Sequence, residues 1–317
     1  MAKKVRISAL SAHYGTIREG GSGGWLHAID DMKQHLSNVI SQVLPDQPDL
    51  IVLPECCDMP ANYSAEQRKQ FYRERGDSIL HFMAGIASDN SCHIAYPSMR
   101  EAAEGTWFNS VQLLGRSGEV LGVYNKNHAV ISEIMDDGVR CGIEAPIIEC
   151  DFGRVGFAIC FDLNFDQLRM QYVRDKPDLI VFPSMFHGGL MQQYWAYSCR
   201  AHFVGAIAGG LPSAILSPVG NTIAQTSSYY AYTSATVNLD CAVIHLDGHQ
   251  AKLKAMRQKY GSNVTITDPS YLGSVLLASE TDEVTMQDLL TEYDFKLLDD
   301  YMTESLSFHN NPSYREK

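Results

Sequence analysis

Several features that would place a chain of 317 residues in a particular class are absent from this sequence. No apolar run is long enough to cross a bilayer, and no apolar segment of signal-peptide length follows the short basic start MAKK. The formal net charge is −12 and the sequence has no basic cluster, which argues against nucleic acid as a partner. We therefore expect a cytoplasmic protein that binds neither membrane nor nucleic acid.

The eight cysteines also lack the spacing of a disulfide framework or of a CxxC site. Free cysteines in a large chain are usually small buried residues, and we expect this of most of them. The two histidines of HLDGH, His245 and His249, have no clear third ligand, so the sequence indicates no metal site.

Strands and helices alternate along most of the chain, and one pattern occurs twice. PDLIVLPE begins at Pro48 and PDLIVFPS begins at Pro177, and each is a short apolar run typical of a buried strand. In both places a strand precedes the motif, and a helix, a strand and a hairpin-like segment follow it. Two similar halves, with helices on the outer faces of two sheets, predict a layered α/β fold with internal pseudo-two-fold symmetry.

The chain departs from this pattern from about Thr236 onward. The segment TMQDLLTEYDFKLLDDYMTESL has the amphipathic, acidic pattern of helices. We expect one domain over residues 1–280 and a C-terminal helical extension over residues 281–317, which packs on its own core or on a partner subunit.

Three polar residues stand at the ends of apolar strands, where packing of the core gives no reason for a polar side chain. Glu55 follows DLIVLP, Lys126 follows the hairpin strand VLGVYN, and Cys160 ends the strand VGFAI. Ligands bind outside the carboxyl ends of strands in sheets covered by helices, so the three side chains are expected to meet in one site. Taken alone, Cys160 is better explained as a core residue, and Glu55 or Lys126 as a solvated charge.

Together these residue types fit nucleophilic catalysis. A thiolate attacks a carbonyl or nitrile carbon, a carboxylate takes the thiol proton and returns it to the leaving amine, and an ammonium stabilises the oxyanion. A lysine near the thiol also favours the thiolate.

Three segments resemble the nitrilase superfamily of carbon–nitrogen hydrolases in the order that the family has them: LPECC, WFNSVQLLGRSGEVLGVYNKNH and GFAICFDLNF…PDLIVFPSMF. The resemblance covers roughly residues 5–245. It implies a four-layer α-β-β-α sandwich with a Glu-Lys-Cys triad, in which Glu55 is the general base, Lys126 stabilises the oxyanion and Cys160 is the nucleophile. The amide of Phe161 would be a second oxyanion donor.

Many members of this superfamily have a second glutamate between the lysine and the cysteine. Glu133 and Glu144 are the candidates here, and Glu133 before MDDG fits the family's pattern better. By the pseudo-symmetry with Glu55, the residues after the second strand motif are expected to face the cleft and to bind substrate, although core packing is an equal alternative for the methionine. They are Ser184, Met185, Phe186 and His187.

The segment after the nucleophile departs from the family's commoner forms. Asn164 stands where many amidases have arginine, and Phe161-Asp162 replaces the Trp-Glu that is typical of nitrile-cleaving members. The departures favour amide or carbamoyl chemistry over nitrile chemistry.

We therefore expect a cysteine-dependent hydrolase that cleaves the non-peptide C–N bond of a small linear amide or N-carbamoyl compound through a thioester on Cys160. The resemblance implies no metal or organic cofactor, and a homodimer or larger homo-oligomer. Three alternatives stay open: a nitrilase, an acyltransferase that uses an acceptor other than water, and a non-catalytic binding protein on the same fold.

Overall fold

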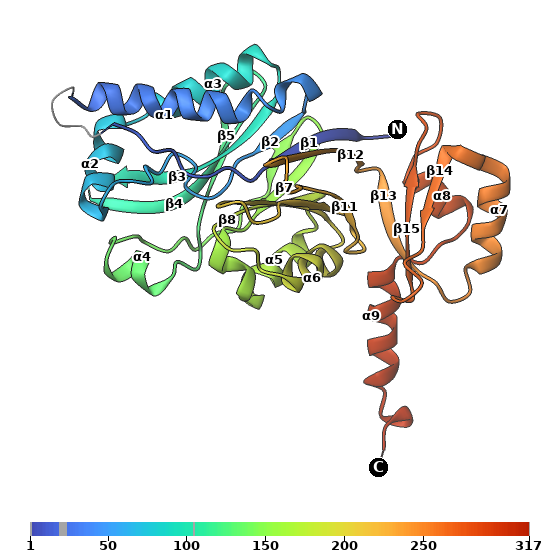
Figure 1. Ribbon diagram of the computed structural model, residues 1–317. Coiled ribbons are helices and arrows are strands. Elements are labelled where there is room, and N and C mark those ends of the chain that lie inside the picture. Colours follow the sequence, from blue (N-terminus) through green and yellow to red (C-terminus); the bar gives the residue numbers. More distant parts are fainter. Residues whose placement is uncertain (1, 19–23, 104, 317) are drawn as a thin grey trace. The chain divides into compact units, whose positions relative to one another are not determined.

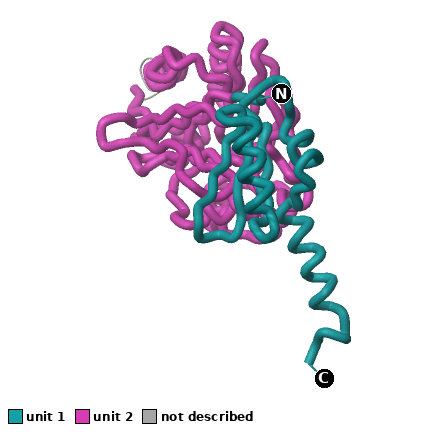
Figure 2. Tube along the Cα trace, turned by 90° about the vertical axis from the view of Figure 1, so that its right-hand side faces the viewer, with its two compact units in different colours: residues 1–4, 238–317 teal, residues 5–237 magenta. Residues whose placement is uncertain are grey.

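The computed structural model describes residues 2–18, 24–103 and 105–316. The chain divides into two compact units, residues 5–237 and residues 238–317 with residues 1–4, which Figure 2 shows in different colours. Each unit contains its own cluster of buried apolar side chains. In the part of the chain that the structure describes, no helix is long and apolar enough to cross a membrane.

The first sheet of the larger unit has the strand order β12-β1-β2-β3-β4-β5. Strands β1, β2 and β3 are parallel, whereas β4 and β5 each run antiparallel to the strand before them. The strands are β1 (Lys4–Leu10), β2 (Leu50–Val52), β3 (His93–Ala103), β4 (Thr106–Leu114), β5 (Val120–Asn125) and β12 (Tyr232–Asn238).

The second sheet has the order β11-β10-β9-β8-β7-β6. Here β7, β8 and β9 are parallel, β10 and β11 continue antiparallel, and β6 pairs antiparallel with β7. The strands are β6 (Ile148–Cys150), β7 (Gly153–Phe157), β8 (Leu179–Ser184), β9 (His202–Ile207), β10 (Ala214–Leu216) and β11 (Thr222–Gln225).

The two sheets thus repeat one series of pairings, three parallel strands followed by two antiparallel ones. The repeated motif also takes the same place in each, because Leu50 of β2 lies beside Ile7 of β1 and Leu179 of β8 lies beside Val155 of β7. This agreement confirms the predicted internal pseudo-symmetry.

Helices cover the outer face of each sheet (Figure 1). On the first sheet lie α1 (Gly24–Ile40), α2 (Ala65–Arg75) and α3 (Ser78–Asp89), and on the second lie α5 (Asp166–Asp175) and α6 (Leu190–Cys199). Buried side chains of α1 and α3, such as Met32 and Met83, pack with Ile51 of β2 in one core. The predicted α-β-β-α sandwich is therefore confirmed. A five-residue helix, α4 (Ile131–Met135), lies in the segment between β5 and β6.

The smaller unit has an antiparallel sheet in the order β13-β15-β14. Its elements are β13 (Cys241–His245), α7 (Gln250–Tyr260), β14 (Val264–Thr267), β15 (Ser274–Ser279), α8 (Met286–Glu292) and α9 (Leu298–His309). The domain boundary predicted at residues 280 and 281 falls between β15 and α8. Leu277 of β15 and Leu289 of α8 share one apolar core, so this structural unit extends across that position.

Candidate active site

Glu55 lies just beyond β2 and is almost completely buried, with 1% of its surface exposed. Its Oε1 accepts hydrogen bonds from Lys126 Nζ at 2.9 Å and from Asn109 Nδ2 at 2.8 Å, and its Oε2 accepts one from the Met185 amide at 3.0 Å. A buried carboxylate is tolerated only when it is paired and hydrogen-bonded. Both oxygens of Glu55 meet this condition.

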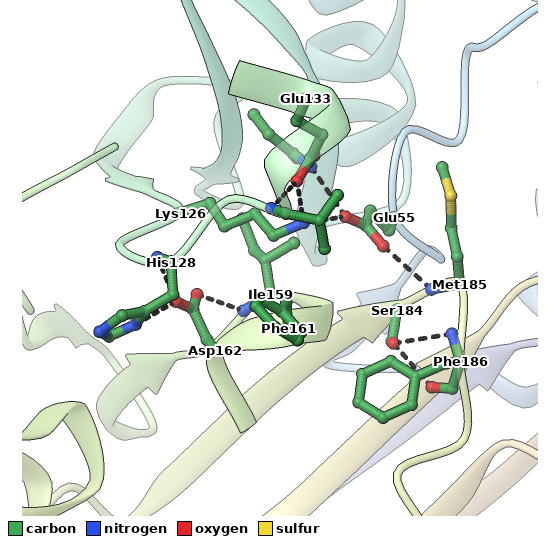
Figure 3. A network of polar contacts seen from close by, with 12 residues as sticks. Glu55, Lys126, His128, Glu133, Ile159, Phe161, Asp162, Ser184, Met185 and Phe186 are labelled. Atoms are coloured by element: carbon green, nitrogen blue, oxygen red, sulfur yellow. Dashed lines mark hydrogen bonds and ion pairs between the residues drawn. The ribbon is translucent and has the colours of Figure 1, made fainter. Parts of the chain in front are cut away.

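Lys126 begins the loop after β5 and is also 1% exposed. Its ammonium lies between Glu55 and Glu133, at 2.9 Å from Glu55 Oε1 and 2.8 Å from Glu133 Oε2 (Figure 3). Burial alone would disfavour the ammonium, but the two carboxylates outweigh it and raise the pKa of Lys126 above its ordinary value. The lysine therefore stays positively charged at neutral pH.

Glu133 lies on α4 and is held by the same neighbours. Besides Lys126, its Oε2 accepts from the Val130 amide at 2.8 Å, and its Oε1 accepts from Asn109 Nδ2 at 2.9 Å. Glu144, the alternative from the sequence, lines a different cavity with Cys141. Of the two glutamates, Glu133 is the one in contact with Lys126.

Cys160 begins a 3-10 turn, Cys160–Asn164, which is separated from the end of β7 by two residues. Its φ is +50°, in the left-handed region that residues other than glycine adopt only where the surroundings enforce it. Asp162 enforces the turn, because its carboxylate accepts from the Ile159 amide at 2.9 Å while its own amide donates to the Ile159 carbonyl.

The Cys160 thiol is neutral in this environment. Burial raises its pKa to about 12, and the Glu55 carboxylate contributes in the same direction, while Lys126 and the Met185 amide act against them. A thiol with this pKa needs a base to become a nucleophile near neutral pH, and Glu55 is the adjacent carboxylate.

Asp162 also joins the turn at Cys160 to the loop that begins at Lys126. It is fully buried, and its carboxylate accepts from Tyr124 Oη at 2.7 Å. The same carboxylate accepts from the His128 amide at 2.8 Å and from its ring Nδ1 at 2.9 Å (Figure 3). Tyr124 and His128 stand two residues before and two residues after Lys126. Asp162 therefore fixes the Lys126 segment relative to Cys160.

A cavity of about 270 Å³ contains these groups, and its size suits a small molecule. Glu55, Lys126, Glu133, Cys160 and Met185 all contribute to its lining. The three residues predicted to act together, Glu55, Lys126 and Cys160, are thus brought to one cavity.

Of the residues predicted to bind substrate, Met185 lines this cavity. Phe161, Ser184, Phe186 and His187 are not part of its lining in the described chain. Ser184 Oγ donates to the Phe186 carbonyl at 2.7 Å and accepts from the Phe186 amide at 3.0 Å, and His187 Nδ1 accepts from the Gly189 amide. The role of these four residues in binding substrate stays a prediction.

Sequence reasoning missed one of the polar groups that organise the site, Asn109, which donates to both glutamates from within β4. It occurs in WFNS, a segment that carried the resemblance. Among the described residues, no group of three or more His, Cys, Asp or Glu side chains could hold a metal ion.

The sequence profile of the family described as carbon-nitrogen hydrolase matches residues 21–255, well over half of the chain. This chain belongs to the carbon-nitrogen hydrolase family. The sandwich fold of this hydrolase agrees with that of the nitrilase superfamily.

Two curated relatives and one solved structure illustrate the similarity. Hydrolase C26A3.11 of Schizosaccharomyces pombe is 23% identical over 49% of this chain and 51% of its own length. Omega-amidase NIT3 of Saccharomyces cerevisiae is 23% identical over 64% of this chain and 72% of its own. The match thus spans about half of the first relative and nearly three quarters of the second.

The structure is an amidase from Nesterenkonia sp. AN1, described with acrylamide added at its active-site cysteine. It is 16% identical, with a TM-score of 0.59, and the likeness covers 79% of this chain and 98% of that one. At this identity the likeness shows the shared fold of the two hydrolases.

Proposed function

We propose that this hydrolase is an amidase that cleaves the C–N bond of a small linear amide or N-carbamoyl compound through a thioester on Cys160. The observation that carries the proposal is the buried cluster in which Lys126 lies between Glu55 and Glu133, in the same cavity as the Cys160 thiol. The omega-amidase among the relatives and the amidase among the solved structures support amide chemistry.

The first half of the reaction forms the thioester. Glu55 takes the proton of the Cys160 thiol as sulfur attacks the amide carbon, so the carbonyl becomes a tetrahedral oxyanion. The Lys126 ammonium stabilises that charge, and the Phe161 amide is the second expected donor. Glu55 then returns the proton to the nitrogen, the C–N bond breaks, and ammonia or an amine leaves.

The second half of the reaction releases the acid. Glu55 takes a proton from water, and the resulting hydroxide attacks the thioester carbon. Collapse of the second tetrahedral intermediate breaks the C–S bond, and the proton held by Glu55 returns to sulfur. Glu133 has a positioning role throughout, because its carboxylate keeps Lys126 charged and in place between two acids.

A substrate panel tests the proposal. Ammonia release from amides, N-carbamoyl compounds and nitriles of equal chain length is expected to be fastest with one of the first two classes. Fastest release from nitriles would favour the nitrilase alternative, and hydroxamate formation in the presence of hydroxylamine would report transfer to an acceptor other than water. If no class reacts and the thiol resists alkylation, the chain is a binding protein on this fold.

The homodimer or larger homo-oligomer expected from the family stays a prediction. Sedimentation equilibrium of the purified full chain decides it directly, since a monomer mass at micromolar concentration contradicts the expectation.

A further inference from the structure

Asn109 lies behind the charged cluster of the active site, within β4. Its side chain is 1% exposed and is not part of the cavity lining in the described chain, so a substrate in the cavity does not touch it. One nitrogen atom, Nδ2, donates to Glu55 Oε1 at 2.8 Å and to Glu133 Oε1 at 2.9 Å. Asn109 is therefore a single neutral group that contacts both glutamates and lies outside the space for the substrate.

The main chain of Asn109 also holds the lysine of this cluster. The Lys126 amide donates to the Asn109 carbonyl at 2.8 Å, which ties the residue after β5 to the position of β4 that binds the glutamates. One residue of the sheet thus contacts all three charged residues around the ammonium, two of them through its side chain and the third through its backbone.

The charges around Asn109 fix the orientation of its amide group. If the amide were turned by half a revolution, its oxygen would face two carboxylate oxygens, and this contact is repulsive. In the observed orientation Oδ1 is buried, and it has no hydrogen-bond partner among the described residues. A buried acceptor without a partner is costly, so the asparagine suits the two carboxylates better than it suits the stability of β4.

Glu133 has few other anchors. It lies on α4, a helix of five residues that are all at least partly exposed. Its carboxylate accepts from Lys126, from the Val130 amide at the start of its own helix, and from Asn109. Of these three partners, Asn109 is the one that belongs to a strand of the sandwich, so it connects this short helix to the rigid part of the fold.

A neutral group with two donors leaves the Lys126 ammonium free to act. An ammonium has three N–H donors, and two of them bond to Glu55 and Glu133. The third is available to an oxyanion while both carboxylates keep their places. A cationic side chain in place of Asn109 would compete with Lys126 for the carboxylates, and an acidic one would repel them.

We propose that Asn109 is a positioning residue of the amidase reaction. By donating to both glutamates at once, it keeps Glu55 beside the Cys160 thiol and keeps Lys126 between its two acids. This inference rests on the proposed function, because the steps that Asn109 supports are proton transfer by Glu55 and oxyanion stabilisation by Lys126.

The kinetic test compares Asn109→Ala with the control Gln112→Ala. Gln112 is a buried amide on the same strand, and its distance of three residues places it on the opposite face of β4. Asn109→Ala is expected to lower kcat about 10- to 100-fold. Its KM should stay within about three-fold of the wild-type value, because the lost group does not contact the substrate. Gln112→Ala is expected to keep the wild-type kcat.

Asn109→Asp gives a readout that a merely structural role would not move. Burial and the carboxylates of Glu55 and Glu133 raise the pKa of the new carboxyl group, and Lys126 counters them only in part because its ammonium is already shared between those two acids. Below the raised pKa the neutral group can donate one hydrogen bond, whereas above it a third carboxylate repels the other two. The kcat of this variant relative to the wild type should therefore fall as the pH rises. A structural defect would lower kcat by the same factor at every pH.

Crystal structures of the wild-type chain and Asn109→Ala test the inference without turnover. In the variant, at least one of the two carboxylates is expected to leave hydrogen-bond contact with the Lys126 ammonium. If a carboxylate moves in this way but the wild-type chain hydrolyses neither amides nor N-carbamoyl compounds, Asn109 positions the glutamates and the proposed function fails.

A wild-type kcat in Asn109→Ala together with unchanged contacts of Lys126 overturns the inference. If Asn109→Ala does not fold, Asn109→Asp decides the question, since its side chain has nearly the same shape. A ratio of its kcat to the wild-type kcat that is constant with pH then overturns the positioning role.

Discussion

Glu55 and Ser184 occupy corresponding places in the two halves of the sandwich, each one residue after the proline that closes a buried apolar strand. Both are buried. The Glu55 carboxylate accepts from a lysine, an asparagine and a backbone amide. Among the described residues, the Ser184 hydroxyl bonds only within its own turn, to Phe186.

The two strand ends meet through the residue after Ser184, because the Met185 amide donates to Glu55 Oε2. One copy of the motif therefore supplies the charged group and the other supplies a backbone donor that orients it. The repeated fold thus provides two equivalent positions, and the lysine and asparagine around Glu55 stabilise a carboxylate at one of them.

Substitution of Cys160 is expected to have the largest effect on activity, because its sulfur forms the covalent bond to the acyl carbon of the substrate. Cys160→Ala should lower kcat by about 10⁴-fold or more. Cys141→Ala is the matched control, since Cys141 is exposed and lines a different cavity. Steady-state ammonia release measures both, and substantial turnover by Cys160→Ala would exclude the thioester route.

Glu55→Gln removes the carboxylate that the first half of the sandwich has and the second half, with Ser184 at the corresponding position, lacks. The amide side chain has nearly the same shape but cannot take the thiol proton, so the rate of acylation should fall about 10²–10⁴-fold. Single-turnover measurements separate this step from product release. Acylation at the wild-type rate would move the role of general base to another group.

The protonation state of Cys160 predicts how alkylation depends on pH. Because the pKa of the thiol is raised to about 12, the thiolate fraction and the rate with iodoacetamide should increase about ten-fold per unit between pH 8 and pH 10. A free cysteine levels off above a pH of about 8.5. Peptide mass spectrometry after timed alkylation follows Cys160 specifically, and a plateau near neutral pH would instead indicate a preformed thiolate–lysine pair.

Asp162→Asn tests the connection between the turn at Cys160 and the loop that begins at Lys126. The Asn side chain would present a donor to groups that already donate, so we expect kcat to fall about 10- to 100-fold with little change in KM. Loss of these bonds should also lower the free energy of unfolding by about 1–3 kcal/mol.

Asp166→Asn is the control for this substitution, because the Asp166 side chain is exposed and forms an ion pair with Arg169, three residues further along α5. If Asp162→Asn and Asp166→Asn lower the free energy of unfolding equally and neither changes kcat, Asp162 has a structural role alone.

Ser184→Ala should have the smallest effect, since this strand end supplies no charge. We expect kcat to change less than ten-fold and the free energy of unfolding to fall by about 1 kcal/mol through loss of the bonds to Phe186. Urea denaturation and ammonia release give the two values. A loss of activity as large as that of Glu55→Gln would contradict the proposed difference between the two halves.

Much of the fold was predictable because the repeated motif carries strong local signals. The apolar runs that contain Leu50–Val52 and Leu179–Ser184 are buried strands, and the alternation around them gave the layered architecture. The meeting of Glu55, Lys126 and Cys160 followed from a general rule about the ends of parallel strands.

Other parts of the site depend on packing that local patterns do not contain. The face that α2 turns to the cavity follows from how the helix lies on the sheet, so the side chains that line the cavity from α2 were not readable from the sequence. The bonds of Asp162 join residues far apart in the chain. The change of pattern at about Thr236 lies close to the start of the smaller unit, but the core that β13 to β15 share with α8 was not readable from local patterns.

The central claim is a covalent acyl group on Cys160, and mass spectrometry of the acid-quenched enzyme during turnover tests it most directly. The account predicts that the peptide containing Cys160 gains the mass of the amide substrate minus ammonia, and that the adduct is absent from Cys160→Ala. Two results would contradict a thioester on Cys160. One is turnover without an adduct on any cysteine under conditions where acylation is fast, and the other is an adduct confined to another cysteine.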